Sequence, residues 1–332
     1  MKRSGLGLDD IADWRNLTAA FHRAAQGKGD RDEVQRFRAD LFGELARLRA
    51  ALLDGSVEVG RLRCFHIRDP KPRVIHAPCF RERVLHHALM AHVGPVLDRA
   101  LVADTYACRV GKGTLAAVQR VQHHLRRFPW YAQIDIRAYF ATIDHQVLLA
   151  RLERRFKDRG LLALFARIIA AHHTEPGKGL PIGALTSQHF ANYYLAGLDR
   201  LLLESCRVRG LARYMDDLVW WGDEKAAVCD ALDQACAYAQ DPLQLTVKTT
   251  GPGRGELRRP AVLRLSHPAG STVALAPAQT PLRRAPPCLG KRLGRGSDRR
   301  PNASGRVCRR PGHHRARGCR RVAAGTVAPP PS

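Results

Sequence analysis

The spacing of apolar residues predicts helices at the start of the chain and strands after them. Residues 8–54 have helical spacing, and residues 61–78 alternate as two short strands on either side of Asp69 and Pro70. Residues 81–101 return to helical spacing. Within the first helical stretch, the apolar positions that recur every three to four residues are Val34, Phe37, Leu41, Leu45, Leu48 and Leu52.

The middle of the chain predicts a sheet that is interrupted by helices. The stretch WYAQIDIRAYF (130–140) alternates as a strand, with Ile134 on the apolar face and Asp135 on the polar face. Helices are predicted over about 145–173 and about 184–206, with a Gly/Pro loop between them. RYMDDLVWWGD (213–223) reads as strand, tight turn, strand, because aspartate disfavours strand interiors and suits a hairpin tip. The predicted class is mixed α/β, and more narrowly α+β.

Composition changes sharply near residue 250. The last 82 residues contain no Phe, Tyr or Trp, and 23 of them are Pro or Gly. They carry 18 Lys and Arg against 2 Asp and Glu, which is 16 of the formal net charge of +25. Such a segment cannot bury enough apolar surface to offset chain entropy, so residues 251–332 are predicted to be a disordered basic tail.

The charge excess and the lack of apolar spans limit the classes of function. A net charge of +25 favours a polyanionic partner, with nucleic acid preferred over a membrane surface. No stretch approaches the roughly 18 apolar residues of a membrane span, and the first residues lack the apolar core of an export signal. The nine cysteines are odd in number. We therefore predict reduced thiols, a cytoplasmic location and no membrane partner.

Three carboxylates are candidates for chemistry. Asp216 and Asp217 are adjacent in a stretch that otherwise favours burial, and Asp135 lies on the polar face of another strand. A solvent-exposed turn would explain the first two alone. If the three met, they could bind a pair of Mg²⁺ ions for phosphoryl transfer.

Five segments resemble bacterial reverse transcriptases. YMDD (214–217), QIDIRAYFATIDH (133–145) and GLPIGALTSQHFANYYLAGLD (179–199) are similar to the three central motifs of that family, in the family's order. RDPKPRVIHAPCFRERVLHHAL and DTYACRVGKGTLAAV are similar to the segments upstream of them. IGALTSQ (182–188) resembles the form found in diversity-generating retroelements, and group II intron or retron-type enzymes are the alternative.

The resemblance implies a role for each matching residue. Asp135 and Asp216 would bind two Mg²⁺ ions most directly, with Asp217 contributing less and with Mn²⁺ able to substitute. Lys248 would protonate the leaving pyrophosphate, and Phe140 would be the aromatic gate that selects dNTPs over rNTPs. The remaining matches are Lys71, Arg73 and Gln188 at the dNTP, and Ser187, Tyr214 and Met215 at the template and primer.

Alternatives remain for several of these residues. Lys71 and Arg73 could be surface charges beside two prolines, and Phe140 could be an ordinary core aromatic. In the tail, Cys308, His313, His314 and Cys319 offer zinc-type ligands without a Cys-x-x-Cys pair.

The resemblance also implies an organisation and partners. It predicts an N-terminal helical extension over 1–60 and a right-hand polymerase's fingers and palm over 61–250, the palm having an antiparallel sheet. After residue 250 the family's thumb is missing or scrambled, which is the mark of a frameshift unless the tail is a genuine nucleic-acid-binding segment. The implied partners are an RNA template, a DNA or RNA primer, dNTPs and, in the diversity-generating group, a small basic accessory protein. A non-catalytic nucleic-acid-binding remnant is the rival from another class.

Overall fold

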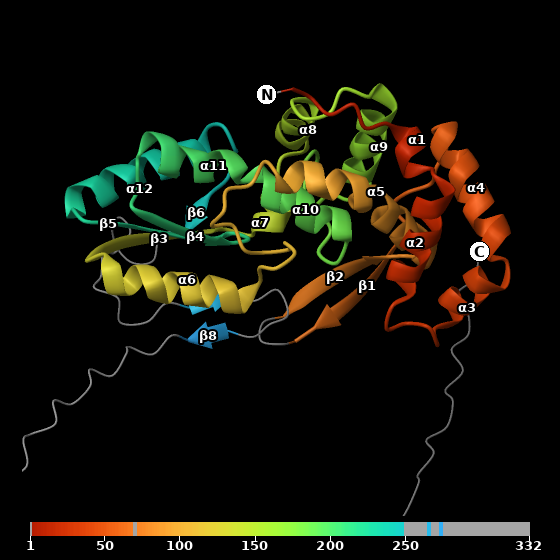
Figure 1. The fold of residues 1–332 in the computed structure, drawn as a ribbon, viewed down its shortest axis with the longest axis horizontal. Coiled ribbons are helices and arrows are strands. Elements are labelled where there is room, and N and C mark those ends of the chain that lie inside the picture. Colours follow the sequence, from red (N-terminus) through yellow and green to blue (C-terminus); the bar gives the residue numbers. More distant parts are fainter. Residues whose placement is uncertain (1, 69–71, 249–263, 267–271, 275–332) are drawn as a thin grey trace, which may run out of the picture. The chain divides into compact units, whose positions relative to one another are not determined.

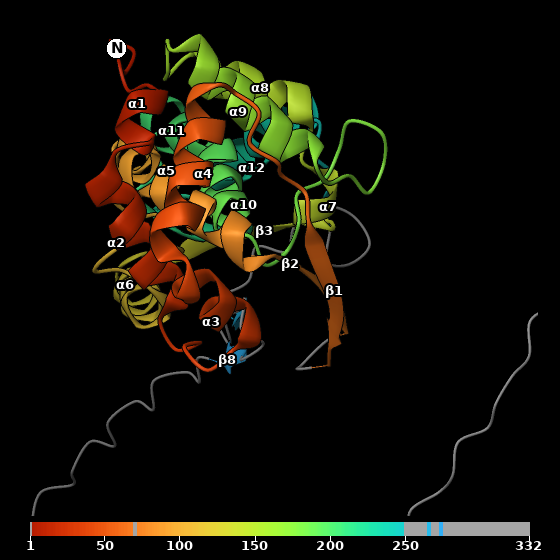
Figure 2. The same ribbon diagram turned by 90° about the vertical axis from the view of Figure 1, so that its right-hand side faces the viewer.

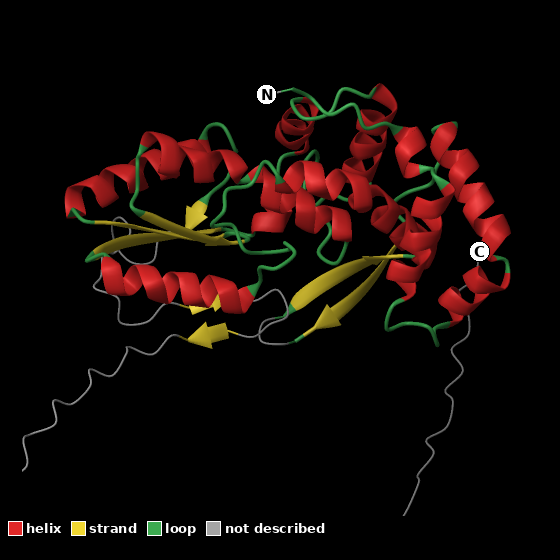
Figure 3. Ribbon diagram, in the orientation of Figure 1, coloured by secondary structure: helices red, strands yellow, loops and turns green. Residues whose placement is uncertain are grey.

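The computed structural model describes residues 2–68, 72–248, 264–266 and 272–274, the last two ranges by their backbone alone. These ranges all lie in the first of two units, Met1–Gln279 and Thr280–Ser332. The described residues form helices and antiparallel sheets (Figure 3), which confirms the mixed class. None of the helices in this part of the chain combines the length and apolar character needed to traverse a bilayer.

The N-terminal helical region is divided into four helices. They are α1 (Leu8–Ile11), α2 (Trp14–Ala25), α3 (Asp32–Ala39) and α4 (Leu41–Leu53). Asp13 accepts hydrogen bonds from the first backbone N–H groups of α2, and Asp40 accepts one from Gly43 at the start of α4. These aspartates favour new helix starts, so the helical structure predicted over 8–54 is confirmed and is divided into four helices.

The two predicted strands over 61–78 form a separate hairpin. β1 (Leu62–Ile67) pairs antiparallel with β2 (Arg73–Pro78), with Leu62 opposite Pro78 and Ile67 opposite Arg73. Figure 2 shows this hairpin extending away from the helices. It leads directly into α5 (Phe80–Asp98), the long helix that packs against α2 and α10 (Leu185–Tyr194).

A four-stranded sheet occupies the other half of the described fold. Its order is β4 (Gly210–Tyr214), β5 (Asp217–Gly222), β3 (Trp130–Ile136), β6 (Val247–Lys248). Helices α6 (Thr114–Arg127) and α12 (Lys225–Gln240) lie on opposite faces of this sheet (Figure 1). Ala132, Ile134 and Ile136 are buried, as the alternation in β3 predicts.

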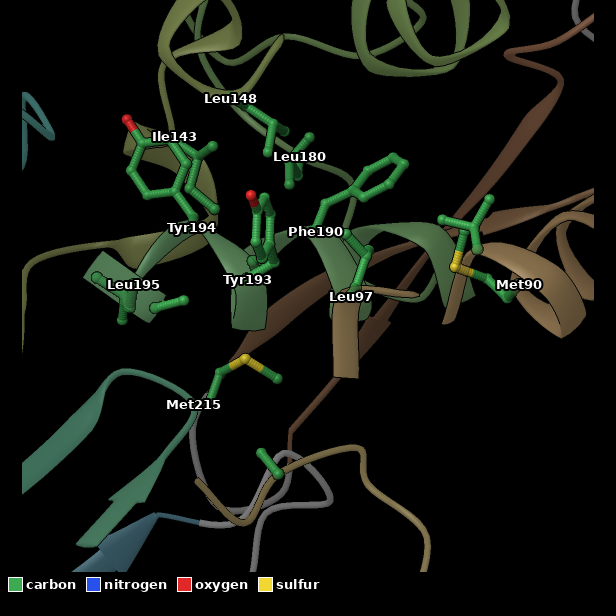
Figure 4. Packing of buried hydrophobic residues seen from close by; sticks show 14 of the residues in the cluster. Met90, Leu97, Ile143, Leu148, Leu180, Phe190, Tyr193, Tyr194, Leu195 and Met215 are labelled. Carbon is green, nitrogen blue, oxygen red and sulfur yellow. The ribbon is translucent and has the colours of Figure 1, made fainter. Parts of the chain in front are cut away.

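Shorter helices lie along the chain between β3 and β4, on either side of α10. They are α7 (Tyr139–Thr142), α8 (His145–Glu153), α9 (Arg159–Ala170), α11 (Ala196–Arg200) and a π-helical turn, Leu201–Ser205. In Figure 4 the side chains of Phe190 and Tyr193 on α10 lie between those of Met90 and Leu97 on α5 and those of Ile143 and Leu148, and Tyr194 lies beside Ile143. The predicted helix over 184–206 is therefore present, with a change of helix at Leu195.

Little of the predicted tail can be compared with the structure. Within 251–332 the described residues are β7 (Arg264–Ser266) and β8 (Thr272–Ala274), which pair antiparallel. The predictions of a disordered tail, a missing thumb and a frameshift otherwise lie outside the described residues, as do the possible zinc ligands.

Candidate active site

The sheet brings the three predicted carboxylates to the same end of the neighbouring strands β3 and β5. Ile134 in β3 pairs with Leu218 in β5, and Asp135 and Asp217 lie one step further along the two strands. Paired positions in an antiparallel sheet present their side chains to the same face. Asp216 lies in the tight turn between β4 and β5, after Met215, whose φ is 59°. The predicted hairpin is confirmed, and its tip adjoins β3.

Lys248 provides a positive charge at this end of the sheet. Asp135 and Lys248 are opposite each other in the short β3–β6 ladder, and Lys248 Nζ lies 2.5 Å from Asp135 Oδ2. Both side chains are partly exposed, at 47% for Lys248 and 38% for Asp135. The ammonium group therefore partly neutralises a carboxylate that otherwise faces other negative charge.

Asp216 is in an unusual electrostatic environment. Burial, together with the negative charge of Asp135, raises the pKa of its carboxyl to about 6, while a backbone hydrogen bond, Lys248 and Arg73 oppose the rise. A proton thus competes for this carboxylate near neutral pH. A cation at the same oxygens would favour the ionised form.

The carboxylates line a cavity with other predicted site residues. The cavity has a volume of about 380 Å³. The predicted residues that line it are Arg73, Asp135, Phe140, Gln188, Met215, Asp216, Asp217 and Lys248. They come from β2, β3, α7, α10, the β4–β5 turn and β6, so segments distant in sequence meet at one place.

A close backbone contact attaches β2 to the start of α10. His76 N donates to Ile182 O at 2.7 Å, and Gly183 has a φ of 118°. A Cβ atom at Gly183 would meet Ile75 Cγ2 at 2.7 Å. Only glycine suits both this φ and this approach, so the Ile-Gly pair of the IGALTSQ motif serves to join Arg73 and Gln188 to the same cavity.

Gln188 is held by a residue to which no role was predicted. Cys108 Sγ donates a weak hydrogen bond to Gln188 Oε1 at 3.7 Å. This contact leaves the amide nitrogen of Gln188 as the group available to the cavity.

Three predicted residues have other placements. Ser187 is 2% exposed and Tyr214 is 6% exposed, and neither lines the cavity. The Tyr214 hydroxyl accepts a hydrogen bond from Thr114 Oγ1 at 3.3 Å. Lys71 lies outside the described residues. The template, primer and dNTP roles of these residues stay predictions.

The donor set suits a hard divalent cation, although the site is not closed around one point. Within the described ranges, no three His, Cys, Asp or Glu side chains converge closely enough to hold a metal ion. Carboxylate oxygens are nevertheless the ligands that Mg²⁺ prefers, and a cation would favour the ionised form of Asp216, a partly buried carboxyl whose pKa is raised. Asp135, Asp216 and Asp217 stay the predicted metal ligands.

Two residues beside the site were missed by the sequence. Arg213 is fully buried in β4 and contacts the turn, and Tyr139 is buried and donates its hydroxyl proton to Ala191 O at 2.5 Å. An arginine inside an apolar strand is a signal of a buried acid, but spacing does not identify that acid.

Comparison with known proteins places these observations in a family. Residues 68–249, just over half of the chain, match the family model described as reverse transcriptase (RNA-dependent DNA polymerase). The chain is 27% identical over 179 residues to protein YkfC of Escherichia coli, covering 50% of this chain and 47% of YkfC. It is 23% identical over 194 residues to the group II intron-encoded protein LtrA of Lactococcus lactis, covering 55% of this chain and 32% of LtrA.

Solved structures with a similar chain include that of a Cas6-RT-Cas1--Cas2 complex. The TM-score is 0.41 at 20% identity, over 70% of this chain and 42% of that chain. The present chain spans less than half the length of the two curated relatives.

Proposed function

Because the chain belongs to the reverse transcriptase family, we propose that it is an RNA-directed DNA polymerase that adds dNTPs to a primer 3′-hydroxyl. The observation that carries this proposal is the shared cavity, in which carboxylates from β3 and the β4–β5 turn face Arg73 and Lys248. Negative groups that attract metal and positive groups that attract phosphate are what nucleotidyl transfer requires.

Asp135, Asp216 and Asp217 would hold the metal ions. A pair of bound Mg²⁺ ions, or Mn²⁺ in their place, would supply activation of the primer hydroxyl and neutralisation of the leaving pyrophosphate. Lys248, which contacts Asp135 in this structure, would protonate the leaving pyrophosphate.

The other residues of the cavity would bind and select the nucleotide. Arg73 would grip the triphosphate with its planar guanidinium, and Lys71 would assist from the preceding turn. Phe140 would pack beneath the sugar and exclude a 2′-hydroxyl. Gln188 would lie at the nascent base pair. Met215, which lines the cavity, and Ser187 and Tyr214, which are buried outside it, would support the template and primer.

This function assigns parts of a right-hand polymerase to the fold. The β1–β2 hairpin and its adjoining helices would be the fingers, and the β4-β5-β3-β6 sheet with α6 and α12 would be the palm, within the predicted range 61–250. Residues 1–60 would be an N-terminal extension. For 251–332 we keep the prediction of a basic tail in place of a thumb.

The subgroup we favour is the diversity-generating retroelement enzyme. The IGALTSQ motif supports it, whereas the similarity to LtrA supports the alternative of a group II intron enzyme, and a retron-type enzyme is a further alternative. Sequencing of cDNA made from a defined RNA template separates them. Misincorporation concentrated opposite template adenines supports the first, and faithful copying there counts against it.

Primer extension on poly(rA)/oligo(dT) with Mg²⁺ tests the activity. The wild-type chain should extend the primer, and Asp216→Asn should reduce extension by at least about 1,000-fold because it removes a metal-binding charge. Asp223→Asn is the matched control, since Asp223 lies just beyond β5, is 58% exposed and pairs with Arg209. Absence of extension by the wild-type chain, with RNA binding retained, would instead support the non-catalytic remnant.

A further inference from the structure

Arg213 is a buried cation for which the proposed chemistry has no direct use. Arg213 lies in β4 and forms an ion pair with Asp199 on α11. Both side chains are 0% exposed. Removing two charges from water is unfavourable, and the attraction between them offsets that penalty only when their geometry is close to ideal. Apolar residues of similar volume often replace such a pair without loss of stability, so stability alone does not explain the pair. We therefore ask which neighbouring groups Arg213 positions.

The guanidinium group donates hydrogen bonds to residues in three separate segments of the chain. Nε donates to Asp199 Oδ1 at 2.7 Å and Nη2 to Asp199 Oδ2 at 2.7 Å. Nη1 donates to Asn192 Oδ1 at 2.8 Å, and Nη2 to Asn192 O at 3.0 Å. Nη1 also donates to Met215 O at 2.9 Å. The planar fork therefore connects α10 and α11 to the turn that carries Asp216.

Met215 is the residue at which such a connection matters. Its φ of 59° is in the left-handed region, which is unfavourable for a residue with a Cβ atom, so surrounding contacts must maintain it. Met215 is 5% exposed, and Figure 4 shows it at the turn below α10. Its carbonyl belongs to the peptide that leads into Asp216. Rotation of this peptide would turn the following carboxylate away from Asp135.

A second layer of contacts fixes the same group. Thr105 Oγ1 donates to Asp199 Oδ2 at 3.1 Å, and Asn192 Nδ2 donates to Ala107 O at 2.8 Å. The backbone of residues 104–106 also bonds to both sides of Arg213, through Arg213 N to Asp104 O and Tyr106 N to Arg213 O, each at 2.9 Å. Arg213 is thus held on its backbone and on its side chain.

We propose that Arg213 is a positioning residue: through Met215 O it holds the β4–β5 turn in the strained conformation that directs Asp216 toward Asp135. The proposal rests on the proposed function, because its purpose is to align metal-binding carboxylates. Arg213 itself does not line the cavity and would not touch the substrate.

Two variants separate positioning from stability. Arg213→Lys keeps a positive charge beside Asp199 but cannot reach Asn192 and Met215 O together. The double variant Arg213→Met with Asp199→Leu replaces the buried pair by apolar side chains, which often preserves stability, and removes the donor to Met215 O. Thr105→Val is the matched control, because it removes a hydrogen bond to the same Asp199 without reaching the turn.

Each full-length variant is measured for thermal unfolding, Mn²⁺ affinity by electron paramagnetic resonance, and primer-extension kinetics. We expect both Arg213 variants to bind Mn²⁺ about tenfold more weakly, as for lost support of a metal ligand. Their kcat should fall about 100-fold with little change in KM for dNTP. Thr105→Val should keep both values within about twofold of wild type, with a small loss of stability.

The outcomes distinguish this proposal from the proposed function. If the wild-type chain extends no primer, the proposed function fails, and the Mn²⁺ affinities still decide whether Arg213 positions the carboxylates. A folded double variant with wild-type Mn²⁺ affinity overturns the positioning role. So does a loss of activity in Arg213→Lys that matches its loss of folded protein.

Discussion

At the residue scale, the site combines three carboxylates with two basic side chains, those of Arg73 and Lys248. Asp135 is bonded to Lys248, while Asp216 keeps a raised pKa because burial and Asp135 outweigh Lys248 and Arg73. In the absence of metal, the folded chain therefore retains a proton on Asp216 that the unfolded chain would release. The contribution of this group to stability is present below the usual aspartate pKa and is lost as pH rises through about 6.

Metal binding should show the opposite dependence on pH. Mg²⁺ must displace the proton from Asp216, so its affinity should fall about tenfold for each pH unit below the pKa of that carboxyl. Calorimetric titration with Mg²⁺ at several pH values between about 5 and about 8 measures this dependence. Asp216→Asn should abolish it and Asp223→Asn should retain it. A pH-independent affinity in the wild-type chain would contradict the assignment of Asp216 as a metal ligand.

Phe140 gives a second prediction at this scale. It lines the cavity from α7 and has its ring 5.8 Å from that of Tyr139. Phe140→Ala should raise kcat/KM for rNTPs relative to dNTPs by about tenfold or more, because a smaller side chain leaves room for the 2′-hydroxyl. Phe140→Tyr keeps the ring and should keep the preference. An unchanged ratio in Phe140→Ala would assign Phe140 to the core.

At the element scale, alternation and turn chemistry predict the strands well but not their partners. The hairpin over 213–223 follows from its apolar pattern and its two aspartates. β6 has only two residues, and its register opposite Asp135 depends on contacts distant in sequence. The sequence allows Asp13 and Asp40 to be predicted as helix caps, because aspartate is a preferred N-cap residue. It does not allow the pairing of Arg213 with Asp199 to be predicted, because several other acidic residues could have been the partner.

The junction between β2 and α10 allows a test of element packing. Gly183→Ala should destabilise the fold by about 3 kcal/mol or more, because it adds a steric overlap with Ile75 to an unfavourable φ. Gly111→Ala is the matched control, since Gly111 has a φ of 72° with no atom within 4 Å of an added Cβ. Its cost should be only about 1 kcal/mol. Urea unfolding of both variants measures the difference in their free energies of unfolding. Equal losses would mean that the overlap with Ile75 does not destabilise Gly183→Ala.

At the scale of the whole molecule, motif order and the family match agree on a reverse transcriptase over 68–249. The sequence predicted which residues would meet in the cavity because the family resemblance supplied their roles, not because spacing brings them together. Ser187 and Tyr214 are buried outside the cavity, and their template and primer roles stay predictions.

Single-nucleotide incorporation by the 332-residue chain is the most direct test of the proposed RNA-directed DNA polymerase activity. Four RNA templates that differ at one base, each annealed to the same DNA primer, are supplied with Mg²⁺ and one dNTP at a time. For an RNA-directed DNA polymerase, the template base should dictate which dNTP is added, and Asp135→Asn and Asp216→Asn should abolish addition. Addition that ignores the template base, or that survives in both variants, would rule out this activity.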